Sequence, residues 1–287
     1  MVALPPLGPS SFDLSGQVAV VTGGSGALGR AVASGLVGAG ARVAVVARHA
    51  GPVQQVAAQL TAQLGAGPAG TKEPAALGLV ADVVDQGQLE AVRQEVMERW
   101  GRVDIVVNAA GGNQAGATVP VGGTFFDLDP QAFRAVVDLN LVGTFLAVQV
   151  FAAAMVSTGT GSIVNVSSAA ASWPLSRVAG YGSAKAGVEN LTRWLAEHIA
   201  RQVSPGIRVN AVAPGFFVGD QNRALLTNPD GSLTDRGQAV VARTPMARLG
   251  QPEDLVGPVL WLASSASSFV TGAVIPVDGG FLAAAGI

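Results

Sequence analysis

The sequence of 287 residues contains no cysteine, only two histidines and only two lysines. Without cysteine the chain can form neither a disulfide nor a thiolate centre. His49 and His198 are the only imidazole groups, so the sequence offers no zinc or iron cluster and a metal-independent chemistry is expected. Tyrosine is scarcer still, because Tyr181 is the only one.

Charge and long apolar runs are also limited. Charged residues make up 13% of the chain and the formal net charge is -2, so no basic stripe is available for nucleic acid and no such partner is expected. The most lipid-like stretch, Leu141 to Val156, contains Thr144 and Gln149 and falls short of the roughly 20 apolar residues that span a bilayer. It predicts a buried or subunit-interface helix, not membrane association.

The first residues predict a tail. Residues 1–14 precede the first apolar run, and Met1 to Ser11 lack the basic segment and long apolar segment of a secretory signal. A cytoplasmic location is therefore expected, with residues 15–287 forming one dinucleotide-binding and catalytic domain.

Apolar residues make up 49% of the chain, and their pattern predicts an α/β fold. Continuous runs of Val, Ile and Ala, typical of strands buried on both faces, alternate with segments of helical periodicity. This alternation predicts a Rossmann-type, doubly wound parallel sheet with helices on both faces. The expected strands are residues 17–22, 41–47, 76–81, 103–108, 162–167, 207–212 and 273–277, and the expected helices are residues 27–37, 53–64, 86–100, 181–201 and 252–263.

A glycine-rich turn follows the first expected strand and opens the first helix. Gly24, Gly26 and Gly29 have the spacing that lets a backbone approach a pyrophosphate at a helix N-terminus. Such a match is weak alone, and its place between strand and helix strengthens it. We expect this turn to bind a nicotinamide dinucleotide through Gly23, Gly24, Ser25, Gly26 and Leu28.

The ends of the next strands bear on which cofactor is bound. The second strand ends at Ala47, where an acid often bonds the ribose of NAD, and Arg48 follows. Arg48 favours NADP over NAD by pairing with its 2′-phosphate, although a solvated arginine beside an indifferent site is the alternative. Further cofactor contacts are expected at the ends of the third and fourth strands, at Asp82, Val83, Asn108, Ala109, Ala110 and Gly111. For Asp82 the alternative is a plain strand-end cap.

Tyr181 and Lys185 are one helical turn apart, so their side chains share a helix face. Reduction of a ketone needs a proton donor, and an ammonium about 4 Å away supplies about 4 kcal/mol toward lowering a phenol pKa. Ser168, at the end of a strand, can bond the substrate oxygen, with Ser167 as its rival. Asn140 lies inside an apolar helix, where it either holds the lysine and a water or satisfies local backbone.

Together these residues resemble the short-chain dehydrogenase/reductase family over about residues 16–280. The resemblance implies that Asn140, Ser168, Tyr181 and Lys185 form the catalytic tetrad, with Tyr181 as general acid/base and Lys185 also bonding the nicotinamide ribose. It also places the cofactor beside the turn that contains Pro214, Gly215 and Phe217. Three departures stand out: Ala27 replaces the middle glycine, Gly219 replaces a threonine that bonds the nicotinamide amide, and Ala47 leaves the cofactor open.

A finer resemblance rests on three motifs, Gly111-Gly112-Asn113, Pro214-Gly215-Phe216-Phe217 leading to residues 221–226, and residues 275–281. These motifs resemble those of bacterial fructuronate reductases, also called mannonate oxidoreductases, which implies a keto-sugar acid as substrate. The family resemblance also implies subunit association, most often as a tetramer. Arg177 and Arg223 suit a carboxylate, while Asn113, Gln221 and Asn222 suit hydroxyls. The alternative is that both arginines are surface or subunit-contact charges. Reduction of a neutral sugar, polyol or oxoacyl thioester is the second reading, and a nicotinamide-binding regulator without turnover is the third.

Overall fold

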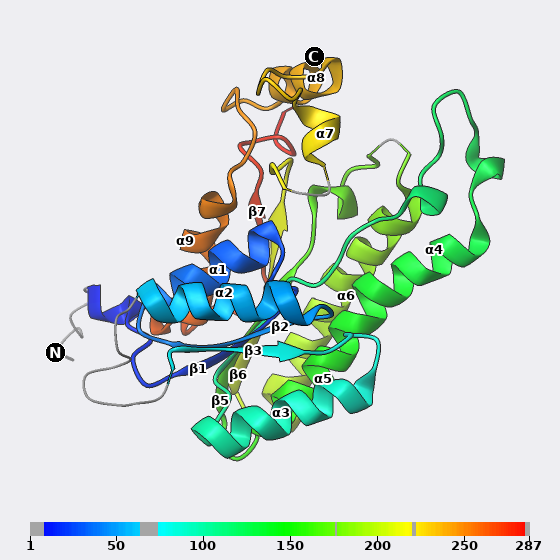
Figure 1. Cartoon of the computed structure of the whole chain (residues 1–287). Coiled ribbons are helices and arrows are strands. Elements are labelled where there is room, and N and C mark those ends of the chain that lie inside the picture. The colour runs from blue at the N-terminus through cyan, green and yellow to red at the C-terminus, as the bar shows by residue number, and fades with distance from the viewer. Residues whose placement is uncertain (1–8, 64–73, 176, 220–221, 285–287) are drawn as a thin grey trace, which may run out of the picture.

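The computed structural model describes residues 9–63, 74–175, 177–219 and 222–284. Seven strands form one parallel sheet in the order β3-β2-β1-β4-β5-β6-β7 (Figure 1). The predicted strands are all present and the doubly wound fold is confirmed. Their bounds are β1 (Val18–Thr22), β2 (Arg42–Ala47), β3 (Ala76–Val80), β4 (Ile105–Asn108), β5 (Thr160–Val166), β6 (Gly206–Pro214) and β7 (Val274–Val277).

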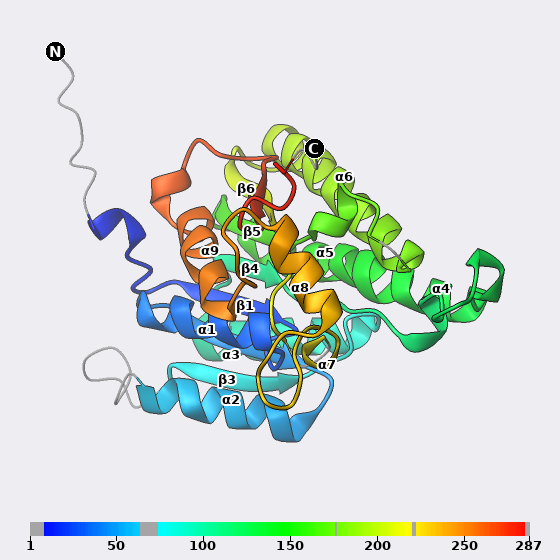
Figure 2. The same ribbon diagram turned by 90° about the horizontal axis from the view of Figure 1, so that it is seen from above.

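Helices cover both faces of the sheet (Figures 1 and 2). One apolar core joins the sheet to α1 (Ala27–Gly38), α2 (Ala50–Gln63) and α9 (Val256–Ala263). A second core joins the opposite face to α3 (Gln86–Trp100), α5 (Gly143–Met155) and α6 (Ala179–Gln202). Alternate residues of one strand enter different cores, as Val18 and Ala19 do, so the central strands are buried on both faces as predicted.

The expected tail is partly wrong. Pro9–Phe12 form a short 3-10 helix, η1, and Leu14 is fully buried in the core shared with α1 and α2. The Leu14 N–H donates to the Ala39 carbonyl at 2.8 Å. A single apolar residue in a polar stretch gave no periodic signal, which is why the sequence did not predict this packing.

The apolar stretch near Leu141 belongs to a longer helical segment. It begins with α4 (Pro130–Val137), passes through a π-helical turn, η4 (Asp138–Val142), and continues as α5. By length and composition alone, Pro130–Met155 is apolar enough to cross a membrane. Here α5 packs on α3, β4 and β5 while α4 packs on α6, so the segment is an integral helix of the fold.

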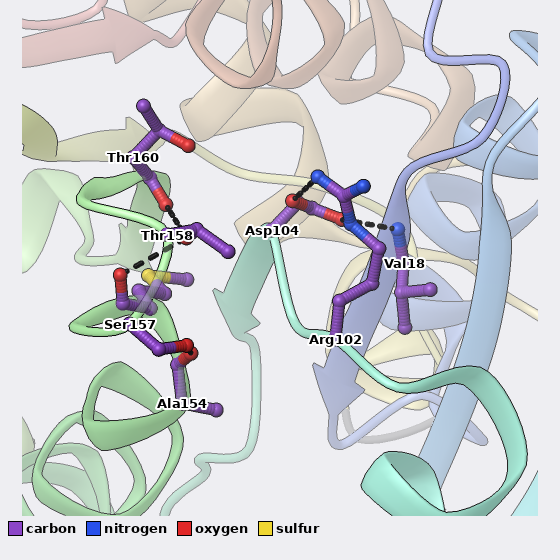
Figure 3. Close-up of polar contacts among 8 residues, drawn as sticks. Val18, Arg102, Asp104, Ala154, Ser157, Thr158 and Thr160 are labelled. Atoms are coloured by element: carbon purple, nitrogen blue, oxygen red, sulfur yellow. Dashed lines mark hydrogen bonds and ion pairs between the residues drawn. The ribbon is translucent and has the colours of Figure 1, made fainter.

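Polar contacts fix the amino ends of the central strands (Figure 3). The buried Asp104 carboxylate accepts a hydrogen bond from the Val18 N–H at 2.9 Å and two from the Arg102 guanidinium at 2.7 and 2.8 Å. This ties the start of β4 to the start of β1. The strand order reverses between these two strands, which opens a crevice at their carboxyl ends.

Two further helices follow β6 and were not predicted. The short α7 (Arg223–Leu226) and α8 (Asp235–Arg243) lie together at the top of Figure 1, apart from the helices that cover the sheet. Leu226, Val240 and Leu249 form a small apolar cluster of their own beneath them. The four residues of α7 are too few to show periodicity, and α8 is a short, mostly polar segment, so this unit was not predicted.

Candidate active site

A cavity of about 700 Å³ lies at the carboxyl ends of the strands. Its walls come from the β1–α1 turn, the ends of β2 and β4, the segment after β5, the start of α6, and the segment from Pro214 to α8. Most of the predicted site residues line it, namely Gly23, Ser25, Gly26, Leu28, Arg48, Val83, Ala109, Ala110, Gly111, Asn113, Ser168, Arg177, Tyr181, Lys185, Pro214, Gly215, Phe217 and Asn222.

The glycine turn is shaped by close backbone packing. A Cβ on Gly23 would lie 2.5 Å from the Ala110 nitrogen, and one on Gly29 would lie 2.4 Å from the Gly23 oxygen. Gly23 also has a φ of 66°. These contacts bring the turn against the end of β4, as the glycine motif predicts.

The N-terminus of α1 faces this cavity without a side-chain cap. Its N-cap is Gly26, which has no side chain to accept from the first-turn N–H groups, while Ala27 and Leu28 line the cavity. A pyrophosphate is the kind of group that meets such unpaired N–H groups and the positive end of the helix dipole. The turn therefore fits a dinucleotide.

Three predicted cofactor residues lie off the cavity. Gly24 packs on β2, since its Cβ would lie 2.7 Å from Val45 Cγ1. Asn108 points between strands, where its Nδ2 donates to Asn165 Oδ1 at 2.9 Å. Asp82 Oδ1 accepts from the Val84 N–H at 3.2 Å, as a strand-end cap would, and its contact with the cofactor stays a prediction.

Tyr181 is half-buried and lies on the cavity wall. Burial raises the pKa of Tyr181, and a hydrogen bond with Ser168 acts in the opposite direction. Burial lowers the pKa of Lys185 to about 8. The direction for Tyr181 is opposite to the expected lowering by the ammonium, because loss of solvent around the phenol disfavours its charged form.

Lys185 nevertheless lies beside the Tyr181 ring. Its Nζ donates to the Val166 carbonyl at 2.7 Å and lies 5.7 Å from the centroid of the Tyr181 ring. The backbone carbonyl at the end of β5 therefore holds the ammonium beside the phenol. The predicted pairing on one face of α6 is confirmed in its geometry.

The two serines have different hydrogen-bond partners. The Ser167 hydroxyl donates to the Lys185 carbonyl at 3.3 Å and to Glu189 Oε1 at 3.0 Å, so it ties the strand to α6. Ser168 instead bonds Tyr181 and accepts from the Ala170 N–H at 3.2 Å. Ser168 thus stands beside the phenol.

Asn140 is fully buried in the π-helical turn and does not line the cavity. Its Nδ2 donates to the Gly112 and Val136 carbonyls at 2.7 and 2.8 Å, and its Oδ1 accepts from the Gly112 N–H at 3.1 Å. A Cβ on Gly111 would lie 2.6 Å from Asn140 Oδ1 and 3.1 Å from Lys185 Nζ. Asn140 therefore holds the loop after β4 in place beside the ammonium.

The predicted substrate residues differ in their placement. Asn113 Oδ1 is buried on the cavity wall and finds no partner among the described residues, while its Nδ2 donates to Thr118 Oγ1 at 2.7 Å. Arg177 has a φ of 77°, and its Nε donates a hydrogen bond to the Val119 carbonyl. This bond connects the segment before α6 to the loop after β4. Asn222 is used by its own turn, with bonds to Gly219 N and the Phe217 carbonyl.

Two other predicted substrate residues are not brought to the cavity. Arg223 is exposed on α7 and does not line it. Gln221 lies outside the described residues.

Sequence reasoning missed two basic residues of this cavity. His49 lines it next to Arg48, and Arg236 lines it from α8. The cavity thus has four cationic side chains, Arg48, Arg177, Lys185 and Arg236, and no Asp or Glu among its described lining residues. The cavity is therefore positively charged although the whole protein has a net charge of -2, and this positive charge favours anionic ligands.

Comparison with known proteins decides the family. A family model described as enoyl-(acyl carrier protein) reductase matches residues 23–282. The uncharacterized oxidoreductase UxuB of Bacillus subtilis is 42% identical and covers 97% of this chain and 99% of its own. The chain belongs to the short-chain dehydrogenase/reductase family.

Solved structures of this family superpose closely. A structure from Haemophilus influenzae, proposed to be a D-mannonate oxidoreductase and with bound NAD, is 35% identical with a TM-score of 0.85, covering 96% of this chain and 98% of its own. A gluconate 5-dehydrogenase from Burkholderia cenocepacia, with NADP and tartrate, is 31% identical with a TM-score of 0.82 at the same coverage. The family binds nicotinamide cofactors, and this chain is one of its oxidoreductases.

Proposed function

We propose that the protein interconverts a ketone and a secondary alcohol on a sugar acid, with D-fructuronate and D-mannonate as the best pair. The observation that carries this proposal is the cationic cavity around Tyr181, which has no acidic side chain among its described lining residues. Asn113 Oδ1 adds an unpartnered acceptor for a substrate hydroxyl. The relatives named as a mannonate oxidoreductase and a gluconate dehydrogenase support the same class.

The side chains around the phenol divide the chemistry of reduction between them. A bound dihydronicotinamide supplies a hydride to the carbonyl carbon. The neutral Tyr181 phenol donates its proton to the carbonyl oxygen, and its raised pKa keeps that proton in place near neutral pH. Ser168 offers its hydroxyl to the same oxygen, and the Lys185 ammonium stabilises the phenolate that remains.

The test is oxidation of NADPH or NADH, followed at 340 nm across a panel of keto-uronates, ketoses and oxoacyl thioesters. We expect the highest kcat/KM with a keto-uronate. A preference for a neutral ketose or polyol, or for a thioester, would replace this substrate with the second reading. Tight cofactor binding with no turnover across the panel would favour a nicotinamide-binding regulator.

We propose NADP as the preferred cofactor, because Arg48 and His49 line the cavity at the end of β2 where no carboxylate follows the strand. A guanidinium beside the adenosine ribose would pair with the 2′-phosphate. Arg48→Gln should therefore lower kcat/KM for NADPH by about tenfold and leave NADH within about twofold. A wild-type preference for NADH would contradict the assignment.

We propose that the protein assembles as a homotetramer through α5 and α6. Large apolar side chains are exposed there, with Phe145 on α5 at 42% and Trp194 on α6 at 56%. Apolar groups gathered on neighbouring helices are typical of a subunit contact. Light scattering on a sizing column should give four chains; a monomer would contradict this.

A further inference from the structure

The helix α8 reaches the cavity with its first turn. Arg236, its second residue, lines the cavity and is half-buried, and its side chain has no ion pair or hydrogen bond among the described residues. The turn is fixed, because the Thr234 side chain accepts from the Gly237 N–H at 3.0 Å and a Cβ on Gly237 would lie 2.1 Å from the Leu226 carbonyl oxygen. A cation at the positive end of a helix dipole is not stabilised by its own helix.

The last residue of α8 is anchored at the other side of the site. The Arg243 guanidinium lies 4.6 Å from the centroid of the Trp173 ring and 5.2 Å from that of Phe281. Phe281 in turn packs edge-on against Phe216, which lines the cavity. Trp173 follows the 3-10 turn that Ser168 caps, so Arg243 connects α8 to the wall that contains Ser168.

The other cationic groups of the cavity have different positions or partners. Lys185 Nζ is bonded to the Val166 carbonyl, and Arg177 Nε to the Val119 carbonyl. Arg48 follows β2, on the opposite side of the β1–α1 turn from the tetrad. Arg236 is therefore the uncommitted guanidinium on the α7–α8 wall, and nearby Asp235 is exposed and outside the cavity lining.

We propose that Arg236 binds the carboxylate of the substrate, and that Arg243 is the positioning residue that holds α8 in place for this contact. The inference rests on the proposed function and names the group that selects an acid over a neutral sugar. A guanidinium offers a carboxylate two parallel hydrogen bonds, which no neutral hydroxyl reproduces. The cofactor also has anionic groups, its phosphates, so the experiment must separate the two sources of negative charge.

The experiment compares Arg236→Gln with the wild-type enzyme on fructuronate and on fructose, and measures NADPH affinity by fluorescence titration. We expect the KM for fructuronate to rise by about ten- to a hundredfold, while the KM for fructose and the Kd for NADPH stay within about twofold. Arg134→Gln, at an exposed arginine of α4 away from the cavity, is the matched control and should match the wild type.

Three outcomes overturn the inference. An unchanged KM for fructuronate would show that Arg236 does not bind the substrate. Equal changes in the KM for both sugars would show that Arg236 does not recognise the carboxylate. A weaker NADPH Kd assigns Arg236 to a cofactor phosphate. Wild-type enzyme that does not turn over fructuronate refutes the proposed function instead, so the two failures are distinguishable.

Arg243 is tested by rescue. Arg243→Met should raise the KM for fructuronate while sparing the KM for fructose, and Arg243→Lys, which keeps a cation between the two rings, should recover part of the loss. Equal effects of Arg243→Met on both sugars, together with a lower melting temperature, would reduce Arg243 to a structural role and contradict its positioning of Arg236.

Discussion

The two ends of the cavity are built in different ways. The cofactor end is backbone: a glycine turn pressed against β4 and an uncapped helix N-terminus, all within residues 22–29. The proposed substrate end consists of side chains from three separate segments, represented by Asn113, Arg177 and Arg236. A continuous backbone segment can bind a phosphate group whatever the substrate is, whereas side chains from separate segments determine which carbonyl compound binds. The difference separates the general part of the enzyme from its specific part.

The largest expected effect lies where the two ends meet, at the phenol. Tyr181→Phe should lower kcat by roughly a thousandfold, because the proton donor is lost, and leave the NADPH Kd within about twofold. Steady-state kinetics and fluorescence titration measure the two quantities. Intact turnover in this variant would end the assignment of Tyr181 as general acid.

The buried ammonium should be visible in stability. The pKa of Lys185 is lowered from 10.5 to about 8, so above pH 8 the folded protein holds fewer protons than the unfolded chain. Stability therefore rises with pH between about 8 and 10.5, by up to roughly 3 kcal/mol at about 1.4 kcal/mol per unit.

Lys185→Met should lack this rise. Urea unfolding of the wild type and of Lys185→Met from pH 7.5 to 9.5 gives the difference in their free energies of unfolding. This pH range lies below the range in which Tyr181 ionises. A difference that stays constant over this range would contradict a desolvated ammonium at Lys185.

The backbone character of the cofactor end predicts a contrast within α1. Gly29→Ala should destabilise the protein by about 2 kcal/mol or more, because its Cβ would overlap the Gly23 carbonyl oxygen. Gly38→Ala, in the same helix with nothing within 4 Å of the new Cβ, is the control and should be neutral or stabilising by up to about 1 kcal/mol. The midpoints of urea unfolding measure the effect of each variant, and equal changes in Gly29→Ala and Gly38→Ala would contradict the steric explanation.

The smallest expected effect concerns Arg223. Its exposed position off the cavity predicts that Arg223→Ala changes the KM for fructuronate by less than about twofold. A tenfold rise would restore the carboxylate role that the sequence suggested, and would weaken the assignment to Arg236.

The sequence predicts the end of the cavity that is built from backbone better than the end that is built from side chains. The strands, the glycine turn and the Tyr181–Lys185 pair are local patterns, and their spacing alone located them. Arg236 is a polar residue in a polar stretch, and only the fold of α7 and α8 brings it to the cavity. Leu14 and Asn108 were misplaced for the same reason, since each depends on a distant partner, Ala39 and Asn165. The phenol pKa was misjudged because burial cannot be read from spacing.

The central claim is that the positively charged cavity binds a ketone that carries a carboxylate and places its carbonyl beside the Tyr181 phenol. It is tested most directly by the ratio of kcat/KM for fructuronate to that for fructose, two ketoses that differ in a carboxylate, with saturating NADPH at pH 7. The account predicts a ratio of at least about a hundred. A ratio near one, or a preference for fructose, would contradict it.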